Sequence, residues 1–525
     1  MKRRSLSITT AWLGLGLWGA AALASGCYNA GADPSLLLQG VGQDGLGTTG
    51  TGGAGGTTTV PPSCVPSNNS DPIDDACGVF VSLSKGDDAN DGATKATPLR
   101  TIAKALGTAK GKPVYLCGET FPEAIDVSAG ALLYGALDCA TDWSYAATKR
   151  SVIAPDADEV PMRVASQVSV EVYDVDLTAK AATKAGGSSI ALLAEAGADV
   201  MLTRGDVTAG DGAAGEDGAP HDMPATDGGE GQPGNDACTM DISGIIVGGG
   251  SVKNTCGADE SVSGAGGIGQ EAGGGDGSDG QPVSAMNGGA GEGGTACTPG
   301  TIGDAGAAGS GGPGATGLGT LSPQGFTGVA GSDGQPGKVA QGGGGGGGAK
   351  GGAGNGMAPQ KKECGTVMNA PGTAGASGGS GGAGGCGGLG GKGGGAGGAS
   401  IGVLSLGATL TFETVKITAG HGGKGGSGGA GQLGGAGGKG AGGGKPPASA
   451  LDLKPACAGG DGGKGGDGGK GGGGLGGPSI GIAYTGDAPA STGAQIAIGG
   501  PGDGGKGDGT PNDGANGIAA ATQKF

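Results

Sequence analysis

Acidic side chains and arginines between residues 156 and 206 are the part of this sequence best suited to chemistry. Two carboxyl groups on either side of a glycosidic bond are the usual means of hydrolysing it. Glu171, Asp174 and Asp176 fall in one predicted strand region, so some of them can share a face. Alternating acids also occur on ordinary solvated strands, and we favour that interpretation, with no catalytic residue. The candidates are Asp156, Asp158, Glu159, Arg163, Glu171, Asp174, Asp176, Arg204 and Asp206.

Other kinds of reactive site find less support. The only histidines, His221 and His421, lie in glycine-rich stretches without a nucleophile elbow. The acidic turn at 86–92 lacks the alternating spacing of an EF-hand loop. The glycine-rich stretches lack the preceding strand and following helix of a phosphate-binding loop. We therefore expect neither a metal site nor a cofactor.

Cysteines indicate a disulfide framework. The chain has 11 cysteines, and ten remain if Cys27 is set aside. An even number suits disulfides in an oxidising compartment, whereas a zinc site is disfavoured because no CxxC pair exists. Sequence alone does not decide connectivity, but chain order favours neighbours. The expected bridges are Cys64–Cys77, Cys117–Cys139, Cys238–Cys256, Cys297–Cys364 and Cys386–Cys457.

The first 26 residues have the pattern of an export signal. Three cationic residues at 2–4 precede an apolar stretch at 8–23 that is too short for a confident membrane span. It ends in Leu-Ala-Ser-Gly-Cys at 23–27, which resembles the lipobox of bacterial lipoproteins. The resemblance implies that Cys27 is diacylated and becomes the mature N-terminus. An ordinary secretory signal with an incidental cysteine is the alternative.

The net charge of the chain limits the classes of binding partner that we expect. The net charge is −17, and removal of the signal segment makes it −20. Such acidity disfavours nucleic acid, and no arginine follows Arg204 to bind phosphate. We expect a membrane partner through the lipid anchor, and a polysaccharide or protein at the cell surface or outside it. The expected location is the outer membrane or cell surface of a Gram-negative bacterium.

Short strands dominate the elements predicted after residue 77. An amphipathic helix is expected at 98–109, because its apolar residues recur near a spacing of 3.6. Three later stretches look like copies of one cassette that runs into glycine, and they begin at Ser189, Ser400 and Ser479. If these are repeats of one unit, the three serines begin equivalent strands and the glycine-rich stretches leave from one corner.

The region 78–210 resembles the pectin-lyase-like parallel β-helix superfamily. The resemblance rests on the Asp-Gly turn at 86–92, on Pro-Leu-Arg-Thr-Ile at 98–102 and on Tyr-Leu-Cys-Gly at 115–118. It implies an all-β, right-handed parallel β-helix with a capping helix at its N-terminal end. Many members of the superfamily cleave acidic polysaccharides with clustered acids and a basic residue. Binding or cleavage of an extracellular polysaccharide is the alternative to a structural role.

Glycine makes up 140 of the 525 residues and recurs at every third position in 422–443 and 459–477. Period three is the repeat of an extended polyproline-II-type chain. Three interpretations remain open: a collagen-like helix, for which proline is scarce, disorder, and packed polyglycine-II segments. We favour packed segments at 420–477 and looser loops at 210–348. Residues 371–445 and 459–477 also resemble PGRS-type glycine-rich surface proteins.

The predicted organisation follows from these boundaries. We expect a structural or adhesive surface lipoprotein, and not an enzyme. Its parts are a signal peptide (1–26), a tether (27–76), a capped β-helix (77–210), a glycine-rich insertion with short strands (211–399), one coil (400–420), a second insertion (421–478), and a last coil with a glycine-rich tail (479–525).

Overall fold

The structure is a computed structural model that describes residues 60–525, apart from 70, 239–243, 353–373, 449 and 451. The expected signal peptide, Cys27, Cys364 and the tether as far as residue 59 lie outside the described residues. No helix in the described part of the chain is long and apolar enough to cross a membrane.

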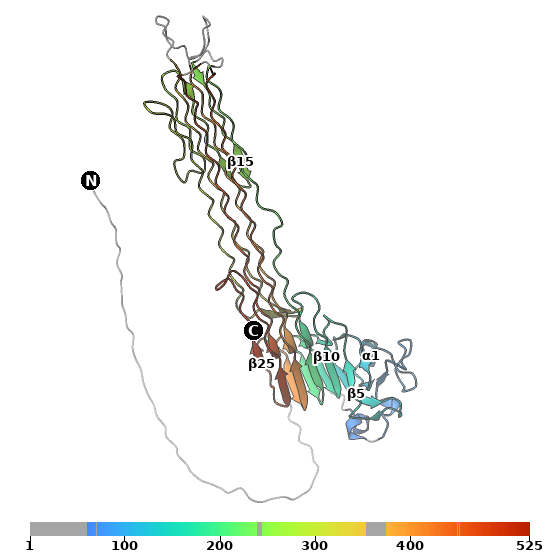
Figure 1. Ribbon diagram of the computed structural model, residues 1–525. Coiled ribbons are helices and arrows are strands. Elements are labelled where there is room, and N and C mark those ends of the chain that lie inside the picture. The colour runs from blue at the N-terminus through green and yellow to red at the C-terminus, as the bar shows by residue number, and fades with distance from the viewer. Residues whose placement is uncertain (1–59, 70, 239–243, 353–373, 449, 451) are drawn as a thin grey trace, which may run out of the picture. The chain divides into compact units, whose positions relative to one another are not determined.

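Most of the strands belong to three parallel sheets, which we name A, B and C (Figure 1). Sheet A contains, in order, β1 (Val79–Val81), β2 (Val114–Cys117), β5 (Ala131–Asp138), β9 (Ser169–Tyr173), β12 (Asp199–Thr203) and β21 (Thr409–Glu413). Sheet B contains β3 (Thr120–Phe121), β7 (Ser151–Ile153), β10 (Val175–Ala179), β13 (Asp206–Ala209), β22 (Val415–Ala419) and β24 (Ala494–Ile498). Sheet C contains β4 (Ile125–Val127), β8 (Met162–Val164), β11 (Ser189–Ala194), β20 (Ser400–Ser405), β23 (Ser479–Tyr484) and β25 (Ala519–Lys524).

The remaining strands are short and antiparallel. Strand β6 (Ser144–Tyr145) pairs with the end of β5. Three two-stranded sheets lie in the insertion: β14 (Ile245–Ile246) with β17 (Gly269–Gln270), β15 (Lys253–Cys256) with β16 (Asp259–Val262), and β18 (Thr320–Ser322) with β19 (Gly325–Thr327). With one short α-helix among the described residues, the all-β class expected from the sequence is confirmed.

One narrow apolar core lies between the three sheets. Val170 from sheet A, Leu177 from sheet B and Leu192 from sheet C belong to the same buried cluster. In β9 the burial alternates, with Ser169 and Glu171 exposed, because the other face of sheet A meets solvent there. Strand β11 is buried throughout. Its outward residue Ile190 is covered, since the β18–β19 hairpin packs against it.

The strand registers place the three sequence cassettes on top of one another. Ser189 pairs with Ser400, and Ser400 pairs with Ser479. At the end of the cassette Ala209 pairs with Ala419, and Gly420 donates its N–H to Ala209. The prediction that the three serines begin equivalent strands is therefore confirmed, and the glycine-rich segments do leave from equivalent positions.

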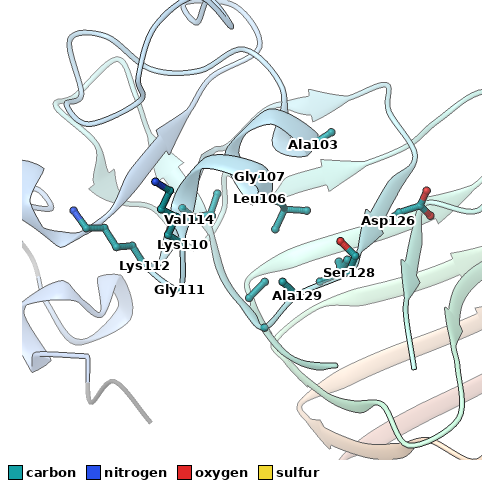
Figure 2. Close-up of a pocket in the computed structure, with 14 residues that line it drawn as sticks. Ala103, Leu106, Gly107, Lys110, Gly111, Lys112, Val114, Asp126, Ser128 and Ala129 are labelled. Atoms are coloured by element: carbon teal, nitrogen blue, oxygen red, sulfur yellow. The ribbon is translucent and has the colours of Figure 1, made fainter. Parts of the chain in front are cut away.

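Helix α1 (Ile102–Ala109) closes the core beside β1 and β2. Thr101 accepts the N–H of Lys104 at its start, and the chain turns at Lys110 with φ 48°. The acidic turn predicted from the sequence has a structural role here, because the carboxylate of Asp88 accepts the N–H groups of Arg100 and Thr101. A hollow of about 340 Å³ lies beneath α1, with Lys110 and Asp126 among its lining residues (Figure 2).

Residues 62–69 and 71–77 cover the outer face of sheet A near β1 and β2. They form three short 3-10 helices, η1 (Pro62–Cys64), η2 (Pro66–Asn68) and η3 (Asp75–Cys77). Ile73 is buried against a cluster that contains Phe80 and Tyr115, and the Tyr115 hydroxyl donates to the carbonyl of Cys64. The packed structure thus begins within the stretch expected to be a tether.

The glycine-rich stretches form extended segments joined by backbone hydrogen bonds, and we name this assembly the glycine array. Its principal segments are 211–237, 298–315, 328–350, 374–399, 420–445, 456–478, 499–507 and 511–518. Hydrogen bonds recur at every third residue: Gly462, Gly465 and Gly468 donate to Gly438, Gly435 and Gln432. Segments 211–237 and 298–315 make the same regular bonds, so order is not confined to 420–477.

Segment 456–478 is one of the enclosed parts of the glycine array. It exchanges backbone hydrogen bonds with segments 298–315, 328–350, 374–399, 420–445, 499–507 and 511–518. A Cβ atom on Gly465 would lie less than 3.0 Å from the carbonyl oxygen of Cys386, closer than real Cβ contacts occur. Glycine is therefore required by the close approach of neighbouring backbones.

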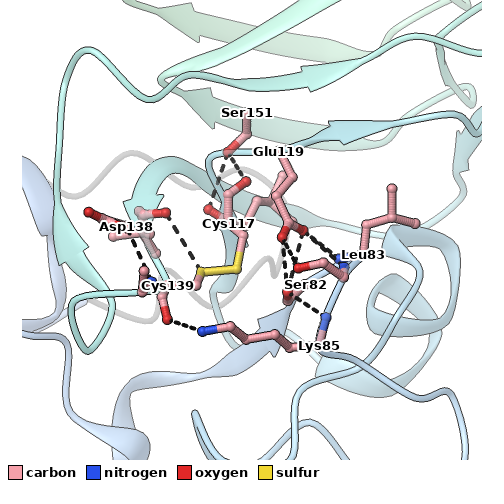
Figure 3. The surroundings of a disulfide bond; sticks show 12 residues. Ser82, Leu83, Lys85, Cys117, Glu119, Asp138, Cys139 and Ser151 are labelled. Carbon is pink, nitrogen blue, oxygen red and sulfur yellow. Dashed lines mark hydrogen bonds between the residues drawn. A yellow bond between two sulfur atoms is a disulfide. The ribbon is translucent and has the colours of Figure 1, made fainter.

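Two of the expected disulfides are present, Cys64–Cys77 and Cys117–Cys139. Figure 3 shows the second. The second lies beside Glu119, whose carboxylate accepts the N–H of Leu83 at 2.6 Å and a hydrogen bond from Ser84 Oγ. Both bridges link residues that are close in sequence, with separations of 13 and 22.

The expected bridges Cys238–Cys256, Cys297–Cys364 and Cys386–Cys457 are wrong. Cys256 bonds to Cys386, and Cys297 bonds to Cys457, with sequence separations of 130 and 160. Cys238 also forms a disulfide, but not with Cys256. Pairing each cysteine with its neighbour in sequence gives wrong bridges here, because the neighbours of a segment in the glycine array come from distant parts of the sequence.

Candidate functional site

The turn between sheets A and B repeats one backbone conformation along the stack. Asp174, Arg204 and Thr414 occupy this position with φ values of 58°, 54° and 56°, and Gly493 follows with 84°. The N–H of Asp174 donates to Thr203, the residue before Arg204 in the next turn. Left-handed residues other than glycine are uncommon, and here they bend the chain from one sheet into the next.

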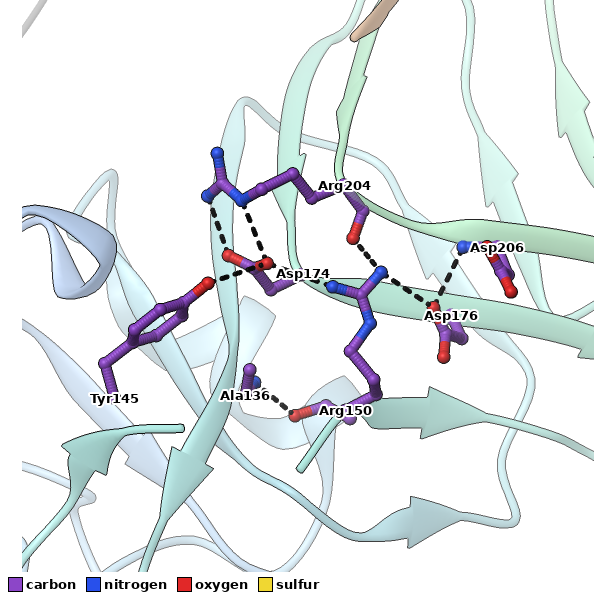
Figure 4. A network of polar contacts seen from close by, with 8 residues as sticks. Ala136, Tyr145, Arg150, Asp174, Asp176, Arg204 and Asp206 are labelled. Carbon is purple, nitrogen blue, oxygen red and sulfur yellow. Dashed lines mark hydrogen bonds and ion pairs between the residues drawn. The ribbon is translucent and has the colours of Figure 1, made fainter. Parts of the chain in front are cut away.

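This corner gathers three of the candidate residues around Asp174 (Figure 4). Arg204 donates to both carboxylate oxygens of Asp174, from Nε at 3.0 Å and from Nη2 at 2.7 Å. Arg150 Nη1 donates to Asp174 Oδ1 at 3.0 Å, and its Nη2 lies 3.3 Å from Asp176 Oδ1. The hydroxyl of Tyr145 donates to Asp174 Oδ1 at 3.1 Å.

Burial makes this a cluster of strong ion pairs. The side chain of Asp174 is 3% exposed, whereas those of Arg150 and Arg204 are 26% and 35% exposed. Hydrogen bonding to Asp174 raises the pKa of the Arg204 guanidinium. Burial, followed by the charge of Asp174, raises the pKa of Tyr145. Both oxygens of the Asp174 carboxylate therefore accept hydrogen bonds from the arginine and tyrosine side chains around it.

Asp176 and Asp206 lie next to this cluster on the outer face of sheet B. The N–H of Asp206 donates to Asp176 Oδ1 at 2.9 Å. Burial raises the pKa of Asp176, while this hydrogen bond and the charge of Arg150 oppose the rise. Asp206 also lines a hollow of about 550 Å³, together with Lys416 and Gln495, which follow it in register on β22 and β24.

The other candidates are dispersed among separate contacts. Asp156 pairs with Lys180 at 3.1 Å, and Asp158 accepts the N–H of Thr183 at 2.8 Å. Glu159 is exposed. Arg163 donates to the carbonyl of Pro323 at 2.8 Å, and Glu171 accepts from the hydroxyl of Tyr173 at 2.8 Å. These five residues do not converge on one place.

Sequence reasoning missed Arg150 and Tyr145. Arg150 stands just before β7, and register places β7 beside β10, which begins immediately after Asp174. The available signal was the basic pair Lys149-Arg150 before a short strand, which becomes informative only when the strand pairing is known.

The arrangement can hold three successive turns together. Each arginine crosses from one turn to the next, and Asp174 lies between them. Arg150 Nη2 also donates to the carbonyl of Arg204, which ties the outer two turns directly. No group of three or more His, Cys, Asp or Glu side chains in the described ranges is arranged to hold a metal ion.

Comparisons with known proteins add no assignment to this geometry. The chain matches no protein-family model and no curated protein at a significant level.

Proposed function

We propose that this protein is an exported, lipid-anchored structural or adhesive protein of the bacterial surface, without catalytic activity. The observation that carries the proposal is the enclosed segment 456–478. Its backbone N–H and C=O groups form hydrogen bonds with six neighbouring segments. Such an assembly offers a long, regular surface of small and charged side chains rather than a deep site. A segment of this kind rises about 3.1 Å per residue, so 23 residues extend roughly 70 Å.

The fold proposed for this role is a right-handed parallel β-helix that carries polyglycine-II segments. It is supported by the recurring order of strands in sheets A, B and C and by hydrogen bonds at every third glycine. The glycine segments then continue the coil at one corner, after Ala209 and Ala419. PGRS-like composition and the lipobox-like stretch ending at Cys27 support the same role.

Lipidation is tested at Cys27. The full chain and its Cys27→Ser variant are expressed in a Gram-negative host with an alkyne fatty acid. We expect the parent chain to carry the label and to appear in the membrane fraction, and the Cys27→Ser variant to do neither. A labelled Cys27→Ser variant, or a parent without label, contradicts the anchor.

The adhesive role is tested by attachment. Beads coated with the Cys27→Ser chain are placed on bacterial cells and on abiotic surfaces, and the force needed to remove them is measured. We expect greater retention than for beads coated with a globular acidic protein of similar charge. If the two kinds of bead are retained equally on every surface, adhesion is contradicted and only a structural role remains.

Cleavage or binding of an extracellular polysaccharide is the second candidate, because Asp206, Lys416 and Gln495 line an open hollow beside Asp176. The assay measures new reducing ends and unsaturated uronides released from a panel of acidic polysaccharides. We expect no turnover. Turnover that is lost in Asp176→Asn and Asp206→Asn but kept in Asp156→Asn would replace the structural proposal by an enzymatic one.

A further inference from the structure

Segment 456–478 changes character along its length. Its third-position residues are Asp461, Lys464, Asp467 and Lys470, and then Gly473 and Gly476. At this point segments 499–507 and 511–518 begin to lie alongside segment 456–478. Gly473 donates to Asn512 and Gly476 to Ala515, both in segment 511–518.

Side chains cannot occupy the positions that these neighbours cover. A Cβ atom on Gly473 would lie less than 3.0 Å from the carbonyl oxygen of Gly505, and one on Gly476 would meet that of Gly502 in the same way. Conversely, the side chains at 461–470 stand where a continued segment 499–507 would pass. Charged residues and a neighbouring segment therefore exclude each other at this face.

The facing row of N–H groups on segment 420–445 shows what replaces the missing neighbour. Gly422, Gly425 and Gly428 donate to carbonyl oxygens of segment 499–507 at 3.0, 2.8 and 2.9 Å. Farther along the same row, Gly434 donates to Asp467 Oδ1 at 2.8 Å and Gly440 to Asp461 Oδ1 at 2.9 Å. The carboxylates thus take the place of backbone carbonyls where segment 499–507 has ended.

The lysines keep these carboxylates in position. Lys439 Nζ lies 2.7 Å from Asp461, and Lys464 Nζ lies 2.8 Å from Asp467. Lys470 Nζ donates to the carbonyl of Gly507, close to the point where segment 499–507 ends. Each charged side chain in the row therefore has a partner within the glycine array.

A second face of the glycine array follows the same rule. On segment 374–399, Gly378 and Gly381 donate to the carbonyls of Gly267 and Gly264. The row continues with side-chain acceptors: Gly384 donates to Ser261 Oγ at 2.8 Å, and Gly393 donates to Asp333 Oδ1 at 2.9 Å. The exchange of carbonyls for side-chain oxygens is thus not peculiar to segment 456–478.

We propose that Asp461, Lys464, Asp467 and Lys470 end the glycine array on this face and so prevent a glycine-rich segment of a second copy from adding to it. An uncovered row of N–H and C=O groups is the same hazard here as at the edge of a β-sheet, where charged residues block unwanted pairing. The four side chains block the row sterically, and the two aspartates accept its N–H groups at Gly434 and Gly440.

The occupant that these residues exclude is residues 47–58 of another copy. Glycine recurs there at 47, 50, 53 and 56, and the stretch carries no charge. It therefore has the period that the array accepts. We assign it to another copy because residues 71–77, the packed part that follows, lie against β1 and β2, whereas segment 456–478 leads into β23.

The test uses the mature chain, residues 27–525, with Cys27→Ser. Asp461, Lys464, Asp467 and Lys470 are all replaced by glycine, and the mass is measured by light scattering after size exclusion. We expect a larger assembly than the parent forms at equal concentration. Deletion of residues 47–58 from the glycine variant is expected to restore the parent mass. Persistent association after the deletion would overturn this choice of occupant.

The matched control is Asp461→Asn, Lys464→Gln, Asp467→Asn and Lys470→Gln. It removes the charges but keeps the bulk and the Oδ1 acceptors, so we expect the parent mass. Association of this control equal to that of the glycine variant would show that charge repulsion, not blocking, keeps copies apart. A folded glycine variant with the parent mass would also overturn the proposal.

A single substitution keeps the proposal testable if the fourfold glycine variant does not fold. Asp467→Gly removes one acceptor, so hydrogen exchange at the Gly434 N–H is expected to quicken about three- to tenfold, the range of one lost hydrogen bond. Exchange at Gly428 should not change, since its acceptor is the carbonyl of Lys506. Unchanged exchange at Gly434 would contradict the capping role of Asp467.

Discussion

Gly465 illustrates how single residues hold the glycine array together. Its hydrogen bond to Gly435 is ordinary, but its missing Cβ is not, because the carbonyl oxygen of Cys386 occupies that space. Gly442 provides the contrast, since a Cβ there would meet nothing within 4 Å. The two glycines look alike in sequence and differ only in what lies beside them.

We expect Gly465→Ala to lower the free energy of unfolding by about 1–3 kcal/mol, the usual cost of overpacking. Gly442→Ala should change it by less than about 0.5 kcal/mol, or raise it slightly by restricting the unfolded chain. Urea unfolding monitored by circular dichroism measures both. Equal effects of the two substitutions would argue against close backbone packing around Gly465.

The Asp174 cluster predicts coupling between its two arginines. Arg150→Met or Arg204→Met alone leaves Asp174 with one cation, whereas the double variant leaves a buried carboxylate without any. An unpaired buried charge is costly, so the double variant should lose more stability than the two single variants together. A double-mutant cycle measures this, and additivity within about 0.5 kcal/mol would show that the arginines act independently.

Helix α1 offers a comparison of two glycines at the scale of an element. Gly107 lies within the helix and Gly111 follows it, and a Cβ on either would meet nothing within 4 Å. Only Gly111 has a positive φ, of 86°. We expect Gly107→Ala to stabilise by about 0.5–1 kcal/mol and Gly111→Ala to destabilise. Thermal unfolding checks the opposite signs, and shifts of the same sign would refute this account.

Segment 420–445 and segment 456–478 carry a prediction about exchange. Because Gly462, Gly465 and Gly468 donate to neighbouring carbonyls, their N–H groups should exchange far more slowly than those of an unstructured glycine peptide. Hydrogen exchange read by mass spectrometry over 420–477 measures this. Complete exchange within seconds would exclude packed segments.

Elements were the level at which the sequence was most informative. The helix, the stacked cassettes and the two local disulfides follow from periodicity, repeated serines and short separations. The bridges of Cys256 and Cys297 do not, because the order of segments in the glycine array is not written in any one segment. The same holds for the candidate site: Asp174, Asp176 and Arg204 were identifiable, but Arg150 and Tyr145 depend on strand register.

Ionised carboxylates along the molecule stabilise the glycine array. Hydrogen bonds from Lys392, Lys439 and Lys464 lower the pKa values of Asp333, Asp461 and Asp467. The pKa of Asp513 is lowered mainly by the N–H of Gly507. These carboxylates contribute stability when ionised, so their contribution is fully present above the unfolded pKa of about 4.

We therefore expect the melting temperature to fall as the pH drops below about 4, while carboxylates that accept N–H groups become protonated. The individual effects are small, since these aspartates are 39–52% exposed and solvent screens their ion pairs. A variant with Asp333, Asp461 and Asp467 changed to Asn should start lower at pH 7 and fall less steeply below pH 4. Parallel curves for the two proteins would exclude this origin.

The central place of segment 456–478 has a consequence for how the molecule is made. Its six neighbours include segments that precede it by more than a hundred residues, such as 298–315 and 328–350. Synthesis runs from the N-terminus, so those segments emerge before segment 456–478, with which they pair. The glycine array can close only when nearly the whole polypeptide has been made, and a chain cut short before residue 456 lacks the partner of all six of these segments.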